Sequence, residues 1–153
     1  LMEDICLKMQ QKNQRPGVQI LFTEKEPCCV INTDRLRLSQ VIINLMNNAM
    51  KFTAEGSITL GYRLNGQSIE LCFFVKDRGF GIPADKAEKV FERFVKLNSF
   101  VKGTGLGLAI CRVIIERLGG TIGVDTAVEE GACFWFRLPV QEDIPLDIPI
   151  NLC

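Results

Sequence analysis

The fold is decided by residues 38–53, which read Leu38-Ser-Gln-Val-Ile-Ile-Asn-Leu-Met-Asn-Asn-Ala-Met-Lys-Phe-Thr53. At about 100° per residue, the side chains of Asn44, Asn48 and Lys51 fall within an arc of roughly 60° on a helix. The neighbouring face is apolar and consists of Leu38, Val41, Ile42, Leu45, Ala49 and Phe52. These two carboxamides and one ammonium form a polar stripe along the helix, and such groups can hold a hydrated metal ion and phosphate oxygens. The stretch therefore predicts a helix that buries one face and carries a binding site on another.

The composition around this helix predicts one compact domain, because 47% of the 153 residues are hydrophobic. Eighteen basic and eighteen acidic residues cancel, so no basic surplus argues for nucleic acid or an anionic membrane surface. No apolar run reaches the roughly eighteen residues needed to cross a bilayer, and no signal-peptide pattern opens the chain. The first residue is Leu1 rather than Met, which suggests a piece of a longer protein.

The cysteines and the missing histidine restrict the chemistry further. The seven cysteines include no C-x-x-C pair, and those in apolar runs (Cys72, Cys111 and Cys133) are interpreted as small core residues. A reducing, cytoplasmic setting follows from this pattern. Because the chain has no histidine, it cannot use one as general base, metal ligand or phosphoacceptor.

The order of elements predicts an α/β two-layer sandwich, a mixed and mostly antiparallel sheet with helices packed on one face. Residues 1–16 are predicted as the end of a helix or a linker, and the tail from Pro139 as irregular surface chain. Helices are predicted at 35–52, capped by Thr33 or Asp34, at 83–94, and at 108–118. Strands are predicted at 18–22, 30–31, 57–64, 68–75, 121–125 and 133–138.

Two glycine-rich segments follow the striped helix. Gly103-Thr-Gly-Leu-Gly107 opens a helix, so free backbone N–H groups and the positive end of the helix dipole can face a phosphate. The alternative is a tight loop that only improves helix packing. The segment matches neither the dinucleotide fingerprint nor the phosphate-binding P-loop.

The other glycine segment, Asp77-Arg-Gly-Phe-Gly-Ile82, ends a buried strand. A carboxylate in this place can accept a hydrogen bond from an exocyclic amine such as that of adenine, while the glycines let the chain turn beneath the base. The alternative is a strand-ending turn capped by the aspartate. Phe52 and Ile82 are candidates for the apolar walls of a base pocket or for the core.

Taken together, these segments resemble the catalytic ATP-binding domain of bacterial sensor histidine kinases, in the GHKL superfamily shared with gyrase, Hsp90 and MutL. Asn44 to Thr53 resembles the N box, Asp77 to Gly81 the G1 box, Phe91-Glu-Arg-Phe94 the F box, and Gly103 to Leu108 the G2 box. The resemblance runs from about Thr33 to Val140. It implies the Bergerat ATP-binding fold and a role in two-component signal transduction.

The resemblance implies a role for each matching residue. Asn48 would ligate Mg²⁺ with help from Asn44, and Lys51 would contact the phosphates. Lys96, just after the F box, would reach the γ-phosphate. The catalytic residues would thus be Asn44, Lys51 and Lys96. The base would lie near Phe52, Asp77, Gly79, Gly81 and Ile82, and the triphosphate along Gly103, Thr104, Gly105, Leu106, Gly107 and Leu108.

The same resemblance implies an organisation and a set of partners. Residues 17–140 would be the ATP-binding catalytic domain, residues 1–16 a linker or the stub of a preceding helical segment, and residues 141–153 a tail. The γ-phosphoryl group would pass to a histidine on a helical dimerisation domain, and then to the receiver domain of a response regulator. The domain would be cytoplasmic and monomeric, in a homodimeric parent whose anchoring in the inner membrane stays open.

Two alternatives remain at this point, a serine-directed kinase of the superfamily and a non-enzymatic switch that binds ATP to control partner docking. The F box and the sequence Gly-Thr-Gly-Leu-Gly-Leu argue against the serine-directed kinase. Hydrolytic relatives carry Glu at the position of Asn44, and an asparagine cannot take a proton from water. The phenylalanines Phe91, Phe94 and Phe100 are predicted to cover core or anchor a lid, and exposed ones could grip a partner domain.

Overall fold

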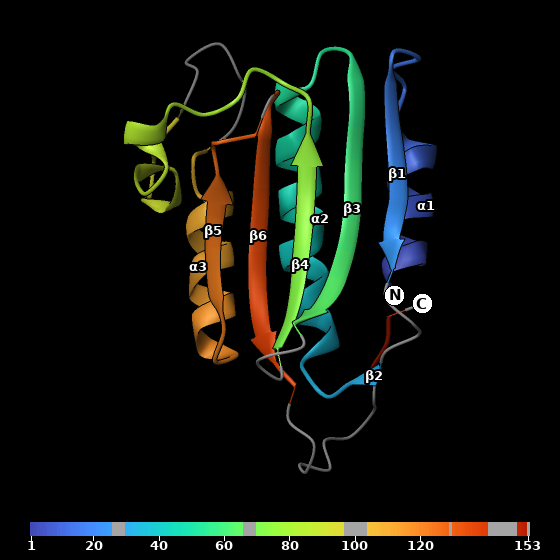
Figure 1. The fold of residues 1–153 in the computed structure, drawn as a ribbon, viewed down its shortest axis with the longest axis vertical. Helices are drawn as coiled ribbons and strands as arrows, with labels where there is room; N and C mark the ends of the chain where they lie inside the picture. Colours follow the sequence, from blue (N-terminus) through green and yellow to red (C-terminus); the bar gives the residue numbers. More distant parts are fainter. Residues whose placement is uncertain (26–29, 66–69, 97–103, 129, 141–149, 153) are drawn as a thin grey trace.

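The computed structural model describes residues 1–25, 30–65, 70–96, 104–128, 130–140 and 150–152. Five strands form one mixed sheet in the order β1-β3-β4-β6-β5, with β1 parallel to β3 and every other pair antiparallel. The strands are β1 (Val18–Lys25), β3 (Gly56–Asn65), β4 (Glu70–Asp77), β5 (Thr121–Asp125) and β6 (Ala132–Pro139). Helices α1 (Met2–Lys12), α2 (Arg35–Phe52) and α3 (Gly107–Arg117) cover one face of this sheet (Figure 1). The predicted α/β two-layer sandwich is confirmed.

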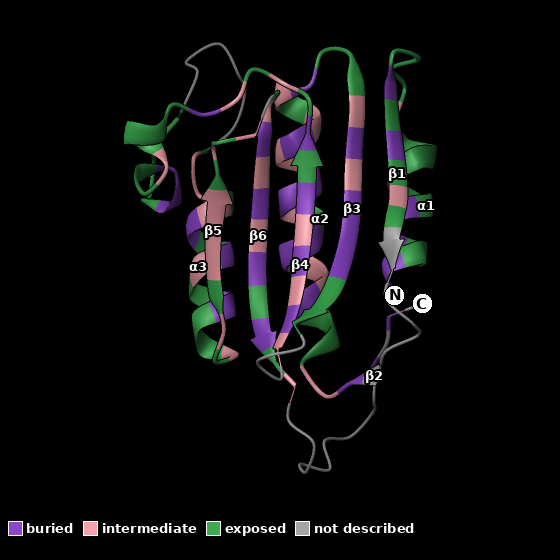
Figure 2. Ribbon diagram, viewed as in Figure 1, coloured by how far each residue is buried: buried purple, intermediate pink, exposed green. Residues whose placement is uncertain are grey.

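The core lies between the sheet and the helices. Along β4 and β6, fully buried residues alternate with partly buried or exposed ones (Figure 2). In β4, Leu71, Phe73 and Val75 are buried toward the helices. Phe73 stacks on Phe136 of the neighbouring β6, with ring centroids 4.7 Å apart. Because successive side chains of a strand point to opposite faces, this register places Asp77 on the helix-covered face too.

Helix α2 begins and ends with hydrogen bonds that fix its position. The side chain of Asp34 accepts a hydrogen bond from the backbone N–H of Arg37 at 3.0 Å, so the predicted cap is present. At the other end, Arg15 Nη1 donates to the carbonyls of Met50 (2.9 Å) and Thr53 (3.2 Å). The guanidinium thereby satisfies carbonyl groups that the helix end leaves without an intrahelical partner.

Residues 1–16 were predicted as the end of a helix or a linker, and the structure has a helix there, α1. This helix packs into the core of the domain. Its buried residues are Met2, Ile5, Cys6 and Met9. Gln10 Nε2 donates to the backbone oxygen of Ile20 in β1 at 2.8 Å. Residues 2–12 therefore share one core with the sheet.

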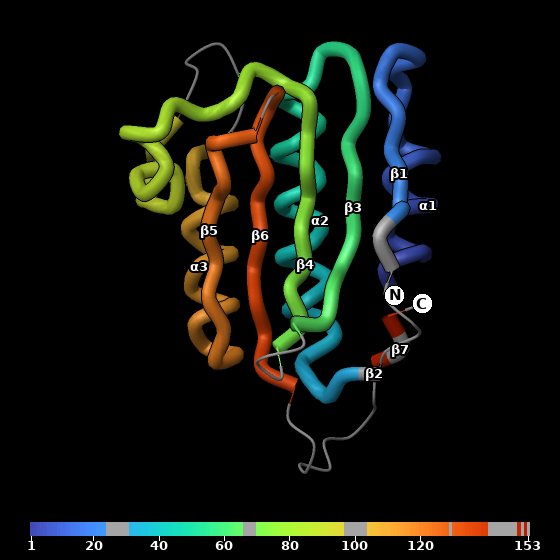
Figure 3. The backbone as a smooth tube through the Cα atoms, in the orientation of Figure 1, coloured from blue at the N-terminus to red at the C-terminus, as the bar shows by residue number. Residues whose placement is uncertain are grey.

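The last described residues correct the prediction of an irregular surface tail. Strand β7 (Ile150–Asn151) pairs antiparallel with β2 (Val30–Ile31), and Leu152 is buried. The backbone N–H of Met2 donates to the oxygen of Leu152 at 3.4 Å, so the two ends of the chain lie side by side (Figure 3). The reason is the apolar Ile-x-Leu at 150–152, which finds buried sites. Residues 141–149 of the tail lie outside the described part.

The helix predicted from Pro83 to Phe94 is wrong. The structure has two short 3₁₀ helices, η1 (Ala84–Lys86) and η2 (Lys89–Phe91). Their bonds run from residue i+3 to residue i, as from Lys86 N–H to the Pro83 oxygen at 2.9 Å. Val90 and Phe91 are both buried, and this tight geometry turns two consecutive apolar side chains inward.

No helix within the described residues is long and apolar enough to cross a membrane.

Candidate active site

The predicted site residues gather at one end of the molecule, where β4 ends, α2 ends and α3 begins (Figure 1, upper end). The antiparallel register of β4 with β6 sets Ala132 beside Asp77 at this end. Sequence segments that lie far apart along the chain thus form one site with a polar end on α2 and α3 and a second end around Asp77.

The polar end is a cavity of about 210 Å³. From α2 it receives Asn44, Asn48 and Lys51, the stripe that the helical periodicity predicted. From the second glycine segment it receives Thr104, Gly105, Gly107 and Leu108. The structure therefore brings the N-box stripe and the described part of the G2 segment to a common space, while Gly103 lies outside the described residues.

The Asn48 carboxamide has an unusual environment in this cavity. Its Nδ2 atom is buried and has no hydrogen-bond partner among the residues that the structure describes. A buried donor without a partner costs free energy, so a ligand or water oxygen is expected to complete it. The donor set fits a hydrated Mg²⁺ with phosphate oxygens, because Mg²⁺ prefers oxygen ligands and keeps several waters. Within the described residues, no three His, Cys, Asp or Glu side chains cluster to offer another metal site.

Helix α3 adds backbone donors to the same cavity. Its N-cap residue, Leu106, makes no side-chain capping hydrogen bond. The first backbone N–H groups of a helix have no intrahelical acceptor, and together they carry the positive end of the helix dipole. An anion bound beside Gly107 would meet these donors. The start of α3 differs in this respect from the start of α2, which Asp34 caps.

The second end of the site is built around Asp77, whose side chain is 3% exposed. Its Oδ1 accepts a hydrogen bond from the backbone N–H of Gly79 at 2.8 Å. Burial raises the pKa of this carboxyl, and backbone hydrogen bonds from Gly79 and Ala132 lower it by less. The carboxylate thus has a fixed orientation and is costly to leave without a further donor.

Two glycines of the first glycine segment are required by close packing. A Cβ on Gly79 would lie 2.3 Å from the Phe52 oxygen and 2.9 Å from Asp77 Oδ1. Gly81 has φ +72°, a left-handed conformation, and its Cβ would lie 3.0 Å from the Gly131 oxygen. The end of α2, the end of β4 and the turn before β6 are therefore in contact here, and Ile82 is buried beside them. The role of these residues as the walls of a base pocket stays a prediction.

Three predicted residues are placed differently. The Leu106 side chain lines a neighbouring apolar groove and does not line the polar cavity. Lys96 is exposed and lines neither of these two spaces. Phe52 is partly buried and contacts the site through its backbone at Gly79.

Other residues of the site were not among the predicted ones. Asn47 lines the polar cavity together with Val90 and Val95. Asn47 could have been identified, because it lies three residues after Asn44 and four before Lys51 and so shares their helix face. The Thr53 hydroxyl, next to Phe52, is fully buried and has no hydrogen-bond partner within the described part of the chain. No sequence signal distinguishes it from an ordinary helix end.

The F-box segment ends in a strained turn. Phe94 has φ +64°, a conformation that costs free energy for a residue with a Cβ. Its backbone N–H donates to the Gly105 oxygen at 2.9 Å, while its side chain is 72% exposed. Phe94 also lines the neighbouring groove, which has a volume of about 650 Å³. One backbone contact thus joins the polar cavity to an apolar surface.

Comparison with protein families agrees with this geometry. Residues 33–142, more than half of the chain, match the profile described as "Histidine kinase-, DNA gyrase B-, and HSP90-like ATPase". The chain belongs to this ATPase family. The match contains both glycine segments, the striped helix and strands β3 to β6, so it covers the whole candidate site.

The relatives of this chain with known sequence or structure include sensor histidine kinases. The sensor histidine kinase RcsC of Escherichia coli K12 is 40% identical over 123 residues, which are 78% of this chain and 13% of RcsC. The catalytic domain of the histidine kinase ThkA superposes with a TM-score of 0.79 at 32% identity, over 91% of this chain and 90% of that one. Full-length ShkA in complex with AMPPNP superposes with a TM-score of 0.81 at 31% identity, over 95% of this chain and 30% of ShkA. The chain thus spans about an eighth of its relative RcsC.

Proposed function

We propose that this chain is the catalytic domain of a sensor histidine kinase, which binds ATP with Mg²⁺ and transfers the γ-phosphoryl group to a histidine outside the chain. One observation carries the proposal most directly. Asn44, Asn48 and Lys51 share a single cavity with the uncapped start of α3 and the glycine segment before it. The similarity to ThkA and to ShkA, which was solved with an ATP analogue, supports the same assignment.

In this proposal the protein acts by positioning and by charge neutralisation. Asp77 accepts a hydrogen bond from the adenine amine, and Gly79 and Gly81 let the backbone pass beneath the base. Lys51 and the free N–H groups of α3 contact phosphate oxygens. Asn48, with Asn44, would hold Mg²⁺, which would supply positive charge beside the phosphates.

The lining of the polar cavity favours transfer to a partner over hydrolysis. No carboxylate is among the described residues that line it, and Asn44 and Asn48 present neutral carboxamides. Hydrolysis of ATP needs a group that positions or deprotonates a water. The described lining of the cavity therefore offers no general base to a water, and in the proposal the phosphoryl group stays on ATP until an acceptor binds. Since the chain has no histidine, that acceptor belongs to another segment.

The apolar groove beside the cavity suits a helical acceptor segment. Its apolar lining consists of Phe94, Leu106, Ala109, Ile110, Val113, Ile114 and Leu118. Arg37, Arg93 and Arg117 stand around it with one acid, Asp34, so an amphipathic helix with acidic flanks would complement it. The hydrogen bond from Phe94 N–H to the Gly105 oxygen joins this groove to the polar cavity. In the proposal, a dimerisation helix docks here, and a response regulator then takes the phosphoryl group from its histidine.

The activity is tested by mixing the chain with radiolabelled ATP, Mg²⁺ and a separately purified histidine-bearing dimerisation segment of the parent protein. The expected result is label on that segment that acid removes, because phosphohistidine is acid-labile. Label that survives acid would indicate hydroxyl phosphorylation and favour the serine-directed alternative. Tight ATP binding without any label would favour the nucleotide-dependent switch.

The site is tested by Asn48→Asp, with ATP affinity measured by titration calorimetry in the presence of Mg²⁺. The substitution places a negative charge opposite the phosphates and removes the Nδ2 donor of Asn48. ATP affinity should therefore fall by at least tenfold. Gln14→Glu is the matched control, since it makes the same chemical change at an exposed position before β1. Equal affinities for the two variants would contradict the assignment of the polar cavity.

A further inference from the structure

A third carboxamide lines the polar cavity, beside the two to which the proposed function gives a role. Asn47 lies on α2 between Asn44 and Lys51, and lines the cavity with them. Its side chain is half-buried, and no hydrogen bond engages it within the described part of the chain. The NH₂ group of this carboxamide can therefore donate to a ligand in the cavity.

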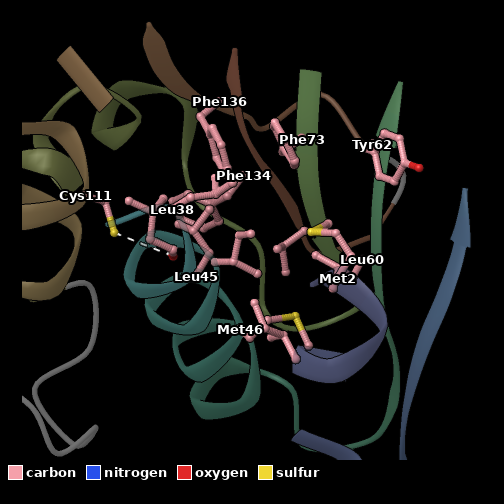
Figure 4. Packing of buried hydrophobic residues seen from close by; sticks show 14 of the residues in the cluster. Met2, Leu38, Leu45, Met46, Leu60, Tyr62, Phe73, Cys111, Phe134 and Phe136 are labelled. Atoms are coloured by element: carbon pink, nitrogen blue, oxygen red, sulfur yellow. Dashed lines mark hydrogen bonds between the residues drawn. The ribbon is translucent and has the colours of Figure 1, made fainter. Parts of the chain in front are cut away.

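The position of Asn47 around the helix separates it from Asn48. The buried residues of α2 share one face, and Figure 4 shows two of them, Leu45 and Met46, among the packed side chains of the core. At about 100° per residue, Asn48 lies roughly 90° from the centre of this buried face, whereas Asn47 lies roughly 170° from it. Ile43, roughly 40° from Asn47, is 37% exposed. Asn48 thus lines the cavity on its core side and Asn47 on its solvent side.

The position of Asn47 along the helix places it away from the base end. The Phe52 carbonyl, at the end of α2, is the group that a Cβ on Gly79 would meet next to Asp77. At about 1.5 Å per residue, Asn47 lies about 7.5 Å from Phe52 along the helix axis, and Lys51 only about 1.5 Å from it. An ATP molecule with its base at Asp77 extends its phosphates from this end into the cavity. The γ-phosphate, which is farthest from the base, therefore lies beyond Lys51, on the stretch of α2 that contains Asn47.

The lining of the cavity has few other donors for this phosphate. Lys51 is the only cation among the described lining residues, and Val90 and Val95 have no polar side-chain atom. Thr104 and Asn47 are the two side-chain donors to which the proposed function has given no contact of their own. A hydrogen bond to a charged phosphate oxygen is stronger than one between neutral groups, so a free NH₂ group at this position has a large effect on affinity.

We propose that Asn47 is a further binding residue of the site, whose side-chain NH₂ group donates to the γ-phosphate and so distinguishes ATP from ADP. The inference rests on the proposed function, in which this cavity holds the phosphates. ADP is the product of phosphoryl transfer and lacks the γ-phosphate. A contact that only ATP makes strengthens the binding of substrate without slowing the release of product.

The test measures the affinities of Asn47→Ala for ATP and for ADP by calorimetry, both with Mg²⁺. The loss of one hydrogen bond to a charged group should lower ATP affinity by roughly five- to tenfold, while ADP affinity stays within about twofold of wild type. Asn47→Asp places a negative charge at the same position and should lower ATP affinity further than alanine does. Gln40→Ala is the matched control, because Gln40 is a half-buried carboxamide of the same helix that does not line the cavity. Its affinities for both nucleotides should equal those of wild type.

Three outcomes would overturn the inference. Unchanged ATP affinity in Asn47→Ala would show that Asn47 is only a solvated residue at the edge of the cavity. An equal loss for ATP and ADP would place its contact on the inner phosphates, and an equal loss in Gln40→Ala would trace the effect to the helix and not to the side chain. A wild-type chain that binds neither nucleotide would instead refute the proposed function.

Discussion

The end of the site around Asp77, proposed for the base, and the polar end, proposed for the phosphates, differ in how many of their polar groups have hydrogen-bond partners within the described residues. They are called the base end and the phosphate end below. At the base end, Asp77 is buried and bonded to Gly79, and Gly79 fits against the Phe52 carbonyl with no room for a side chain. At the phosphate end, Asn48 has an unpaired donor and α3 starts without a cap. The base end is therefore formed before any ligand arrives, whereas the phosphate end needs a ligand to complete its hydrogen bonds. A side chain added at the first should destabilise the fold, whereas one added at the second should weaken binding without destabilising the fold.

The largest effect is expected for Gly79→Ala. The new Cβ would lie 2.3 Å from a backbone oxygen, so the end of α2 and the end of β4 must separate. The free energy of unfolding should fall by about 3 kcal/mol, and nucleotide binding should be lost. Urea unfolding and calorimetry measure the two quantities. Wild-type stability in this variant would show that the base end is less rigid than the contacts imply.

The next effect is expected for Asp77→Asn, which replaces the acceptor of the adenine amine with a group that has only one acceptor oxygen. ATP affinity should fall by roughly a hundredfold, since a hydrogen bond to a charged group is lost. Calorimetry measures this loss. A decrease below threefold would mean that Asp77 is only the cap of a strand-ending turn.

The same variant makes a prediction about stability and pH. Burial raises the pKa of Asp77 above its ordinary value of 3.8, so the folded state binds more protons than the unfolded state above that value. The stability that the protonated carboxyl contributes is then lost as the pH rises from 3.8 through the raised pKa of the folded state. Without nucleotide, Asp77→Asn should therefore gain in thermal midpoint relative to wild type between pH 3.5 and pH 7. A constant difference across these pH values would indicate that burial does not penalise the carboxylate.

Gly107→Ala should weaken ATP binding less than Asp77→Asn does, and, unlike Gly79→Ala, it should not lower stability. A Cβ at this position meets no atom within 4 Å, and alanine is a better helix former than glycine, so stability should stay equal or rise by up to about 1 kcal/mol. ATP affinity should fall by roughly tenfold, because the methyl group occupies the space in which a phosphate approaches the α3 backbone. Unchanged affinity would place the phosphates away from α3.

The smallest effect is expected for Arg15→Gln, which removes two hydrogen bonds at the end of α2. Because this guanidinium is exposed, the cost should be about 0.5–1 kcal/mol of unfolding free energy, without a change in ATP affinity. Arg35→Gln, at the exposed start of the same helix, is the control. A fall in affinity for Arg15→Gln alone would show that the base end depends on this contact.

The sequence predicted the parts of the molecule that follow from periodicity. The helix 35–52, its Asp34 cap and its polar stripe are confirmed as a helix with three side chains in one cavity, because helical spacing alone fixes which residues share a face. The strands of the sheet were predicted to within a few residues for the same reason. Which residues bind ATP and Mg²⁺ stays a prediction until the variants are measured.

The errors fall where tertiary contacts override local pattern. The charged run from Ala84 to Glu92 has helical spacing, but the chain forms two 3₁₀ turns that bury Val90 and Phe91. The burial of Leu152 against the start of α1 depends on residues 150 positions away in the chain. The buried Thr53 hydroxyl, which has no partner among the described residues, and the Cys111 thiol, which donates to the Val41 oxygen, likewise depend on which helix lies next to which.

The position of the two chain ends sets a minimum length for any attached segment that is to reach the groove on α3. Helix α1 and Leu152 lie on the β1 side of the sheet, whereas α3 and its groove lie on the β5 side. Four strand spacings separate these two sides, a distance of about 19 Å. A segment attached at either end needs about six extended residues to cross that width before it can reach the groove. An attachment shorter than this could serve only the groove of a second copy of the protein.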